Sequence, residues 1–151
     1  MLITGISPDT DPLGSEVLAL QHASYAVEAA IINDDRIPPL HESLDDLRAQ
    51  PLLWLGAMDE GDRLVGAVAW EETAGKVDIN RLVVHPEALR RGIGRALVKE
   101  VLARADGRRV VVSTGRDNTP ARTLYERLGF ALRDEVEVIP GLWITNYAYP
   151  A

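Results

Sequence analysis

One stretch of the sequence, LVVHPEALRRGIGRALV at residues 82–98, constrains the fold more than any other. A β-branched strand ends at a His-Pro pair, and after a short loop a helix opens with two glycines and three arginines. Cations at a helix N-terminus are unfavourable unless an anion binds there, because the helix dipole is positive at that end. The junction therefore predicts a site for a phosphate-like anion. The alternative is that the arginines are solvated and the glycines only form a turn.

Five residues would form this anion site. Free amide groups at the helix start would point at the ligand, the glycines would let a pyrophosphate approach the backbone, and arginine side chains would add charge-assisted hydrogen bonds. They are Arg90, Arg91, Gly92, Gly94 and Arg95. The pattern is not a nucleoside-triphosphate loop, which needs a lysine after its glycines, nor a dinucleotide fingerprint, which needs a third glycine where Leu97 stands.

Composition excludes several classes of function. The 151 residues carry a net charge of −7, which disfavours non-specific binding to nucleic acid. The chain has no cysteine, which excludes disulfides, thiolate metal sites and a cysteine nucleophile. We predict no metal. No apolar run is long enough to cross a membrane, and the first residues do not read as a signal peptide, so we expect one domain over 1–151 in the cytoplasm.

Hydrophobic periodicity predicts alternating strands and helices around one mixed sheet. Helices are expected at 13–32, 42–50, 92–105 and 118–129, and strands at 2–6, in a hairpin over 51–72, and at 75–86, 108–114, 130–139 and 142–149. The β-branched run at 108–114 is typical of a strand covered on both faces. The last strand, with Trp143 and Tyr147, would pair either with a second chain in a homodimer or inside its own sheet.

Two segments of the chain resemble the GNAT N-acetyltransferases. Residues 82–98 are similar to their acyl-CoA signature, a strand followed by Gln/Arg-x-x-Gly-x-Gly/Ala, although Leu89 stands where the Gln or Arg is usual. NTPARTLYERLGF at 118–130 matches the family segment Asn-x-x-Ala-x-x-Leu-Tyr-x-x-x-Gly-Phe. The resemblance implies an α/β (α+β) fold, with a mixed, mostly antiparallel sheet of about seven strands flanked by about four helices.

The resemblance also implies a function. The chain would move an acetyl group from acetyl-CoA directly to a primary amine of a small molecule or peptide, with no covalent enzyme intermediate. The alternative is a non-catalytic acyl-CoA-binding sensor on the same fold, because a fold alone does not establish activity. Acetyl-CoA and an amine are the expected partners, without nucleic acid or membrane.

The resemblance assigns cofactor contacts to three segments. Pantetheine would lie against the strand backbone, with the Leu82 amide facing the thioester oxygen. Asn118 would contact the cofactor or cap its helix, or do both. The full set comprises Leu82, Val83, Val84, Arg90, Arg91, Gly92, Ile93, Gly94, Arg95, Ala96, Asn118 and Arg122.

Two residues are the catalytic candidates. Tyr125 lies seven residues after Asn118, on one helix face with it, and would protonate the departing thiolate. The alternative for Tyr125 is a half-buried packing role. Asp78 is the candidate general base, and strand alternation predicts that it shares a face with Asn80 and Leu82. The alternative for Asp78 is a solvated carboxylate.

The acceptor amine is expected near the first two helices and the loop between them. Carboxylates at the mouth of a site attract a cationic amine, although these side chains read equally well as solvated surface. The candidates are Tyr25, Glu28, His41 and Glu42.

Overall fold

The computed structural model describes residues 1–151 and contains a seven-stranded sheet in the order β1-β2-β3-β4-β5-β7-β6. Only β4 and β5 pair in parallel, and every other neighbouring pair is antiparallel. The predicted mixed, mostly antiparallel α/β (α+β) sheet is therefore confirmed. The strands are β1 (Leu2–Ile6), β2 (Leu53–Met58), β3 (Leu64–Thr73), β4 (Lys76–Val84), β5 (Arg109–Gly115), β6 (Ala131–Ile139) and β7 (Leu142–Tyr149).

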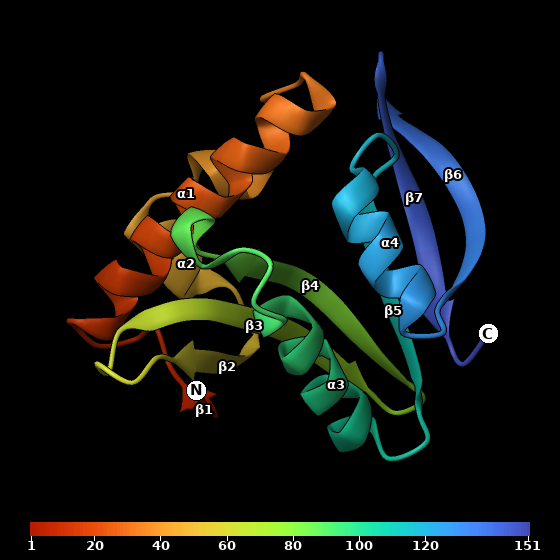
Figure 1. Cartoon of the computed structure of the whole chain (residues 1–151). Helices are drawn as coiled ribbons and strands as arrows, with labels where there is room; N and C mark the ends of the chain where they lie inside the picture. The colour runs from red at the N-terminus through yellow and green to blue at the C-terminus, as the bar shows by residue number, and fades with distance from the viewer.

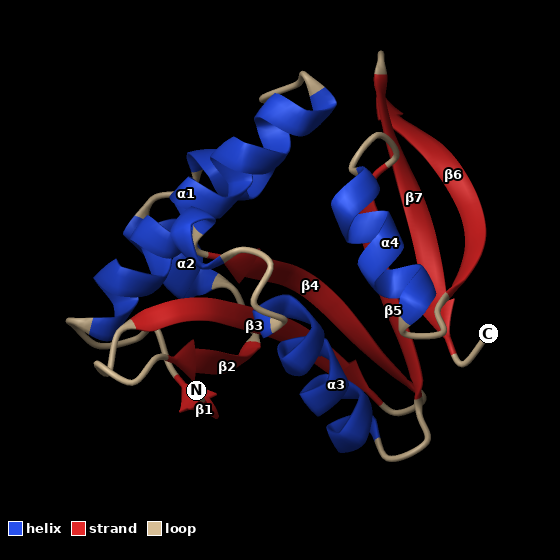
Figure 2. Ribbon diagram, in the orientation of Figure 1, coloured by secondary structure: helices blue, strands red, loops and turns tan.

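Four α-helices and two short 3-10 turns complete the fold (Figure 2). They are α1 (Leu13–Ile32), α2 (Leu44–Ala49), α3 (Ile93–Ala105) and α4 (Thr119–Arg127), with η1 (Pro38–His41) and η2 (Pro86–Ala88). Side chains mark two of the helix starts. Ser43 and Asp46 form a capping box at α2, and Asn118 accepts a hydrogen bond from the Ala121 amide at the start of α4. No helix is long and apolar enough to cross a membrane.

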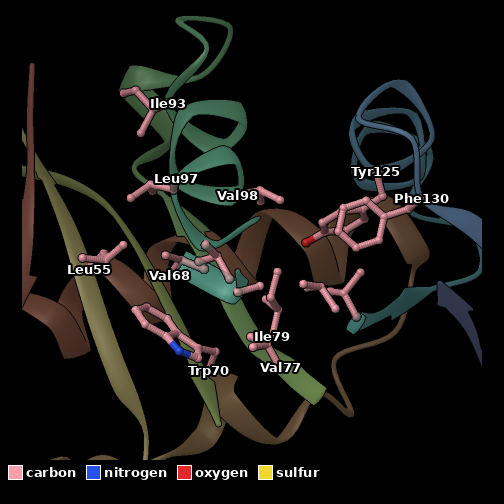
Figure 3. Packing of buried hydrophobic residues seen from close by; sticks show 14 of the residues in the cluster. Leu55, Val68, Trp70, Val77, Ile79, Ile93, Leu97, Val98, Tyr125 and Phe130 are labelled. Atoms are coloured by element: carbon pink, nitrogen blue, oxygen red, sulfur yellow. The ribbon is translucent and has the colours of Figure 1, made fainter. Parts of the chain in front are cut away.

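Alternation along β3 builds a core on each face of the sheet. Val68 and Trp70 pack with α3 and α4 (Figure 3), whereas Ala67 and Ala69 pack with α1 and α2 on the opposite face. Successive side chains of a strand point to opposite faces, so a strand buried on both faces becomes an almost continuous apolar run. This is why LVGAVAW needs no polar residue.

A β-bulge at Asn80 changes the direction of β4. Ala69 pairs with Arg81 and Trp70 pairs with Ile79, so Asn80 is an extra residue without a partner on β3. Val77 and Ile79 accordingly belong to the core under α3, whereas Val83, an even number of residues further on, belongs to the core under α1.

The bulge corrects one prediction for Asp78. Leu82 packs against the same core as Val77 and Ile79, whereas Asp78 alternates with those two residues and faces the other way. The predicted shared face of Asp78 and Leu82 is wrong, because the extra residue between them reverses the alternation.

The parallel pairing of β4 with β5 ends at the bulge. Residues 76–79 of β4 pair with residues 109–112 of β5, and no pairing continues beyond Ile79. Figure 1 shows β4 and β5 spreading apart from their paired ends, with α4 beside β5. The structure thus contains a wedge-shaped opening in the middle of its sheet.

The last strand lies inside the sheet and not at its edge. β7 is flanked by β5 on one side and β6 on the other, and Tyr147 is fully buried. Of the two alternatives for this strand, packing inside its own sheet is confirmed. In β5, Val110 and Val112 are buried and Val111 is half-buried, so the predicted cover is complete on one face at these residues and partial on the other.

Close packing of α3 on β3 gives a test of the fold. A Cβ atom at Gly66 would lie 2.7 Å from Ile93 Cγ2 and 3.2 Å from Leu97 Cδ1, whereas a Cβ at Gly5 in β1 would meet nothing within 4 Å. Gly66→Ala should lower the free energy of unfolding by about 1–3 kcal/mol through overpacking. Gly5→Ala is the matched control. Urea unfolding measures both, and equal stability of the two variants would contradict this packing.

Candidate active site

A groove of about 660 Å³ lies between α3 and α4 at the opening in the sheet. The C-terminal end of β4, with Leu82 and Val84, forms its floor, and α1 forms one of its sides. Many of the residues that line the groove belong to the two segments identified in the sequence or to helix α1. They include Glu28, Leu82, Val84, Leu89, Arg90, Ile93, Gly94, Arg95, Asn118, Ala121 and Leu124. Apolar side chains form most of this surface, so the groove suits a long ligand with a polar end.

The backbone of β4 turns two amide groups toward this opening. His85 donates its amide to the Val65 carbonyl at 2.8 Å. Because the amides of an antiparallel pair alternate in direction, those of Leu82 and Val84 point away from β3. The Val84 amide donates to the Ser24 hydroxyl at 3.2 Å. The Leu82 amide therefore faces the opening, which agrees with the direction expected for it.

The start of α3 forms the polar end of the groove. Gly92 caps the helix with φ of 75°, a left-handed conformation that favours glycine, and its carbonyl accepts the first helical bond from Ala96 at 3.0 Å. No acidic residue occupies the first turn. Arg90 and Arg95 line the groove, so the helix amides and two guanidinium groups lie together there.

Four residues of the predicted cofactor set, Arg122 among them, have side chains elsewhere. Arg91 lines a separate small cavity with Asp59 and Glu60, and Val83 is buried under α1. Ala96 belongs to α3 but does not line the groove. Because their side chains do not line the groove, these residues could contact a ligand there only through their backbone atoms.

A second cavity, of about 410 Å³, lies on the far side of the opening. It is enclosed by α1, the segment around η1, the ends of β5 and β7, and α4. Four residues line both cavities: Glu28, Leu82, Asn118 and Ala121. The groove and the second cavity therefore meet at these residues, beside the Leu82 amide.

Tyr125 lies at this junction. Its side chain is 3% exposed and lines the second cavity, and its ring packs edge-on against Phe130 with centroids 5.4 Å apart. In Figure 3 the hydroxyl oxygen points away from α4. Burial, with the nearby charge of Glu28, raises the pKa of Tyr125 far above its ordinary value. The phenol therefore keeps its proton throughout the neutral range and is available as a donor.

Glu28 projects from α1 to the same junction. The side chains of Asn118 and Thr114 and the Gly115 amide lie around its carboxylate. Burial raises the pKa of Glu28 above the ordinary glutamate value, and these three neutral donors oppose the rise. Tyr25, one helical turn earlier, lines the second cavity beside it, and burial raises the pKa of Tyr25 as well.

A buried ion pair supports the wall of the second cavity. Arg81 is 5% exposed and donates to Glu42 at 2.5 Å and to the Gln21 side chain at 2.9 Å. Gln21 in turn donates to Glu42 and to the Pro39 carbonyl, both at 2.8 Å. The network joins β4, α1 and the η1 segment. Glu42 is therefore a buried partner of Arg81, and not a free carboxylate for an acceptor as predicted.

Three other predicted site residues line neither cavity. Asp78 lies in the paired part of β4 opposite Glu71, and burial raises its pKa. His41 is exposed, with Nε2 2.7 Å from the Asp35 carbonyl. Arg122 donates to the Tyr147 hydroxyl at 3.0 Å and to the Arg116 carbonyl at 3.0 Å. The roles predicted for these residues have no support in this geometry.

Comparison with known proteins extends this description. The model of the acetyltransferase (GNAT) family matches residues 18–130. UPF0157 protein YqkA of Bacillus subtilis (strain 168) is 36% identical over 140 residues, which cover 91% of this chain and 40% of that protein. The chain thus spans two fifths of the length of this curated relative.

Two solved structures share the fold. PaiA N-acetyltransferase from Thermoplasma acidophilum, in complex with coenzyme A, has a TM-score of 0.75 at 20% identity, covering 99% of this chain and 100% of its own. The ribosomal-protein-S18-alanine N-acetyltransferase from Escherichia coli has a TM-score of 0.74 at 15% identity, covering 97% of this chain and 91% of its own.

The Arg81 network predicts a large difference between two glutamate substitutions. Glu42→Gln leaves the buried Arg81 charge without a counter-ion and should lower the free energy of unfolding by about 3–5 kcal/mol. Glu100→Gln removes an exposed i,i+4 partner of Arg104 and should cost at most about 1 kcal/mol. Chemical denaturation measures both variants. A Glu42→Gln protein as stable as Glu100→Gln would show that the network does not hold the wall.

Proposed function

The chain belongs to the acetyltransferase (GNAT) family, and from this premise we propose that it transfers an acetyl group from acetyl-CoA to a primary amine. The proposal rests chiefly on one observation, the meeting of an elongated groove and a second cavity beside the Leu82 amide and Tyr125. One ligand enters from each side, so two substrates can meet without a covalent intermediate on the protein. The coenzyme A complex of the Thermoplasma acidophilum protein, which has the same fold, supports coenzyme A as a ligand of this fold.

In this proposal each part of the groove binds one part of acetyl-CoA. The pyrophosphate lies at the start of α3, against the free amides and the side chains of Arg90 and Arg95. Pantetheine, which carries amide groups of its own, runs along the outward-facing edge of β4. Leu89 adds apolar surface where a polar residue is usual in the family, so Arg90 carries more of the phosphate binding.

The transfer step then takes place at the junction of the cavities. The amine nitrogen attacks the thioester carbon, and the Leu82 amide stabilises the negative charge that develops on the carbonyl oxygen. The carbon–sulfur bond breaks as the amide bond forms. The Tyr125 phenol donates its proton to the departing sulfur, which leaves as the thiol of CoA.

Acetyl-CoA-dependent release of free thiol, measured with a panel of amines, tests the proposal. Release that depends on an amine, together with the acetylated product by mass spectrometry, is the expected result. Binding of acetyl-CoA without release from any amine in the panel would favour the non-catalytic acyl-CoA sensor instead.

Removal of the Tyr125 hydroxyl should slow transfer without weakening CoA binding. General acid catalysis contributes about 10²–10⁴-fold, so Tyr125→Phe should lower kcat by that order. The Kd for CoA should not change, because the ring remains. Tyr147→Phe is the matched control, since its hydroxyl is bound to Arg122 and Glu126 and lines neither cavity. Equal loss of kcat and CoA affinity in Tyr125→Phe would contradict the acid role.

A side chain at Gly94 should block the groove. A Cβ there would already contact Leu124, Leu82 and Val84 at 3.6–3.7 Å, so the two further methyl groups of a valine would occupy ligand space. Gly94→Val should raise the Kd for CoA by at least about tenfold, a cost of 1.4 kcal/mol. Gly75→Val, in an open turn with nothing within 4 Å, is the control. Calorimetric titration with CoA measures both, and unchanged affinity of Gly94→Val would exclude this groove as the CoA site.

A further inference from the structure

Glu28 is the one acidic side chain of the second cavity, and it has no cationic partner. Three charged side chains line that cavity: Glu28, Arg36 and Arg81. Arg36 is paired with Asp34 at 2.7 Å, and Arg81 with Glu42 at 2.5 Å. Glu28 takes part in none of the ion pairs of the chain. A half-buried carboxylate without a cation is a receptor for one.

The rest of the second cavity is mainly apolar. Its wall opposite α4 comes from α1, the η1 segment and the β6–β7 hairpin, with the side chains of Ile32, Ile37, Pro38, Val138, Ile139 and Leu142. The guanidinium of Arg36 closes the outer end, where it also donates to the Pro140 carbonyl at 3.0 Å. A ligand that fits this surface has an apolar body, and its polar group lies at the inner end.

Neutral polar groups surround the Glu28 carboxylate at that inner end. Asn118 is itself held by α4, where its side chain caps the helix, and its amide also lies 3.4 Å from the Thr114 hydroxyl. Thr114 and Gly115 end β5, the strand next to β4 in the sheet. The carboxylate therefore lies beside α4 and β5, at the point where the groove and the second cavity meet.

We propose that Glu28 binds the acceptor amine and receives its proton, and that the acceptors are primary amines carried on an apolar group. This inference rests on the proposed acetyl transfer and names its base and its substrate class. It replaces Asp78, which lines neither the groove nor the second cavity.

The protons balance as follows. An acceptor that binds as an ammonium ion first loses one proton to solvent. The neutral amine then loses one proton to the Glu28 carboxylate as its nitrogen bonds to the acetyl carbon, and Tyr125 gives one proton to the leaving sulfur. The Glu28 carboxylic acid then returns a proton to the tyrosinate. The products are the N-acetyl amine and CoA thiol, and both side chains regain their starting states.

The pH dependence of the rate follows from the same site. The titratable and charged groups around Glu28 are Tyr25 on its own helix, Tyr125 on α4, Arg81 on β4 with its partner Glu42, and Arg36. Burial raises the pKa of Glu28, so its base form is lost as pH falls through a value above the ordinary ~4.3 of glutamate. The rate should therefore fall on the acid side at a pH above the usual glutamate range.

The experiment measures kcat and kcat/KM against pH for the full chain and for Glu28→Gln, Glu28→Asp and Asp78→Asn. The acceptor is hexylamine, which is fully protonated throughout the acid range, so that a break in the profile there belongs to the protein. Glu16→Gln, on the exposed first turn of α1, is the matched control. Benzylamine, hexylamine, spermidine and aspartate then compare apolar, polycationic and acidic acceptors in the wild type.

In the wild type the rate should fall at low pH. The inference is supported if this fall disappears in Glu28→Gln and remains, at a lower overall rate, in Glu28→Asp. The Kd for CoA should be unchanged in both variants. In the wild type, benzylamine and hexylamine should have at least about tenfold higher kcat/KM than spermidine and aspartate, as for a 1.4 kcal/mol difference in transition-state binding. An acid limb that persists in Glu28→Gln, or that disappears in Asp78→Asn instead, would overturn the inference while leaving acetyl transfer established. Thiol release from no amine would overturn the proposed function and this inference together.

Discussion

The extra residue at Asn80 is the constraint on which the site depends. Buried backbone amides and carbonyls must find partners. β4 pairs with β3 on both sides of the extra residue, but with β5 only as far as Ile79. Beyond the bulge the Val84 amide donates to the Ser24 hydroxyl, and the Leu82 amide faces the opening. A ligand with amide groups of its own can then take the place of the missing strand, which is the physical basis for binding pantetheine there.

The bulge also determines which side chains meet at the reaction centre. By reversing the alternation of β4, it places Leu82 and Val84 on the face of α3 and α4, and Arg81 on the face of α1. The cofactor groove therefore has an apolar floor, and the buried arginine is left for the network that holds the η1 segment. One inserted residue separates the cofactor surface from the acceptor wall.

Much of the fold could be predicted because it depends on local patterns. The helix at 13–32 has the predicted bounds, and the arginine- and glycine-rich helix start is found where the motif indicated. The face on which Asp78 lies could not be predicted, because the sequence pattern of a strand does not show where a β-bulge adds a residue. Arg122 lies at the edge of the α4 face that carries Asn118, and there it reaches Tyr147, which follows 25 residues later. The partner of Glu42, Arg81, is 39 residues away.

Ion pairing decides which charges in the second cavity are free to act. Arg36 and Arg81 bring positive charge to the second cavity, but Asp34 and Glu42 neutralise it, so the arginines serve to hold its walls. The donors around Glu28 are neutral, so they do not cancel its charge. The net result is a cavity with one uncompensated negative charge at its inner end. A cationic or amine ligand gains most by entering it, and an acidic one would leave two carboxylates facing each other in an apolar site.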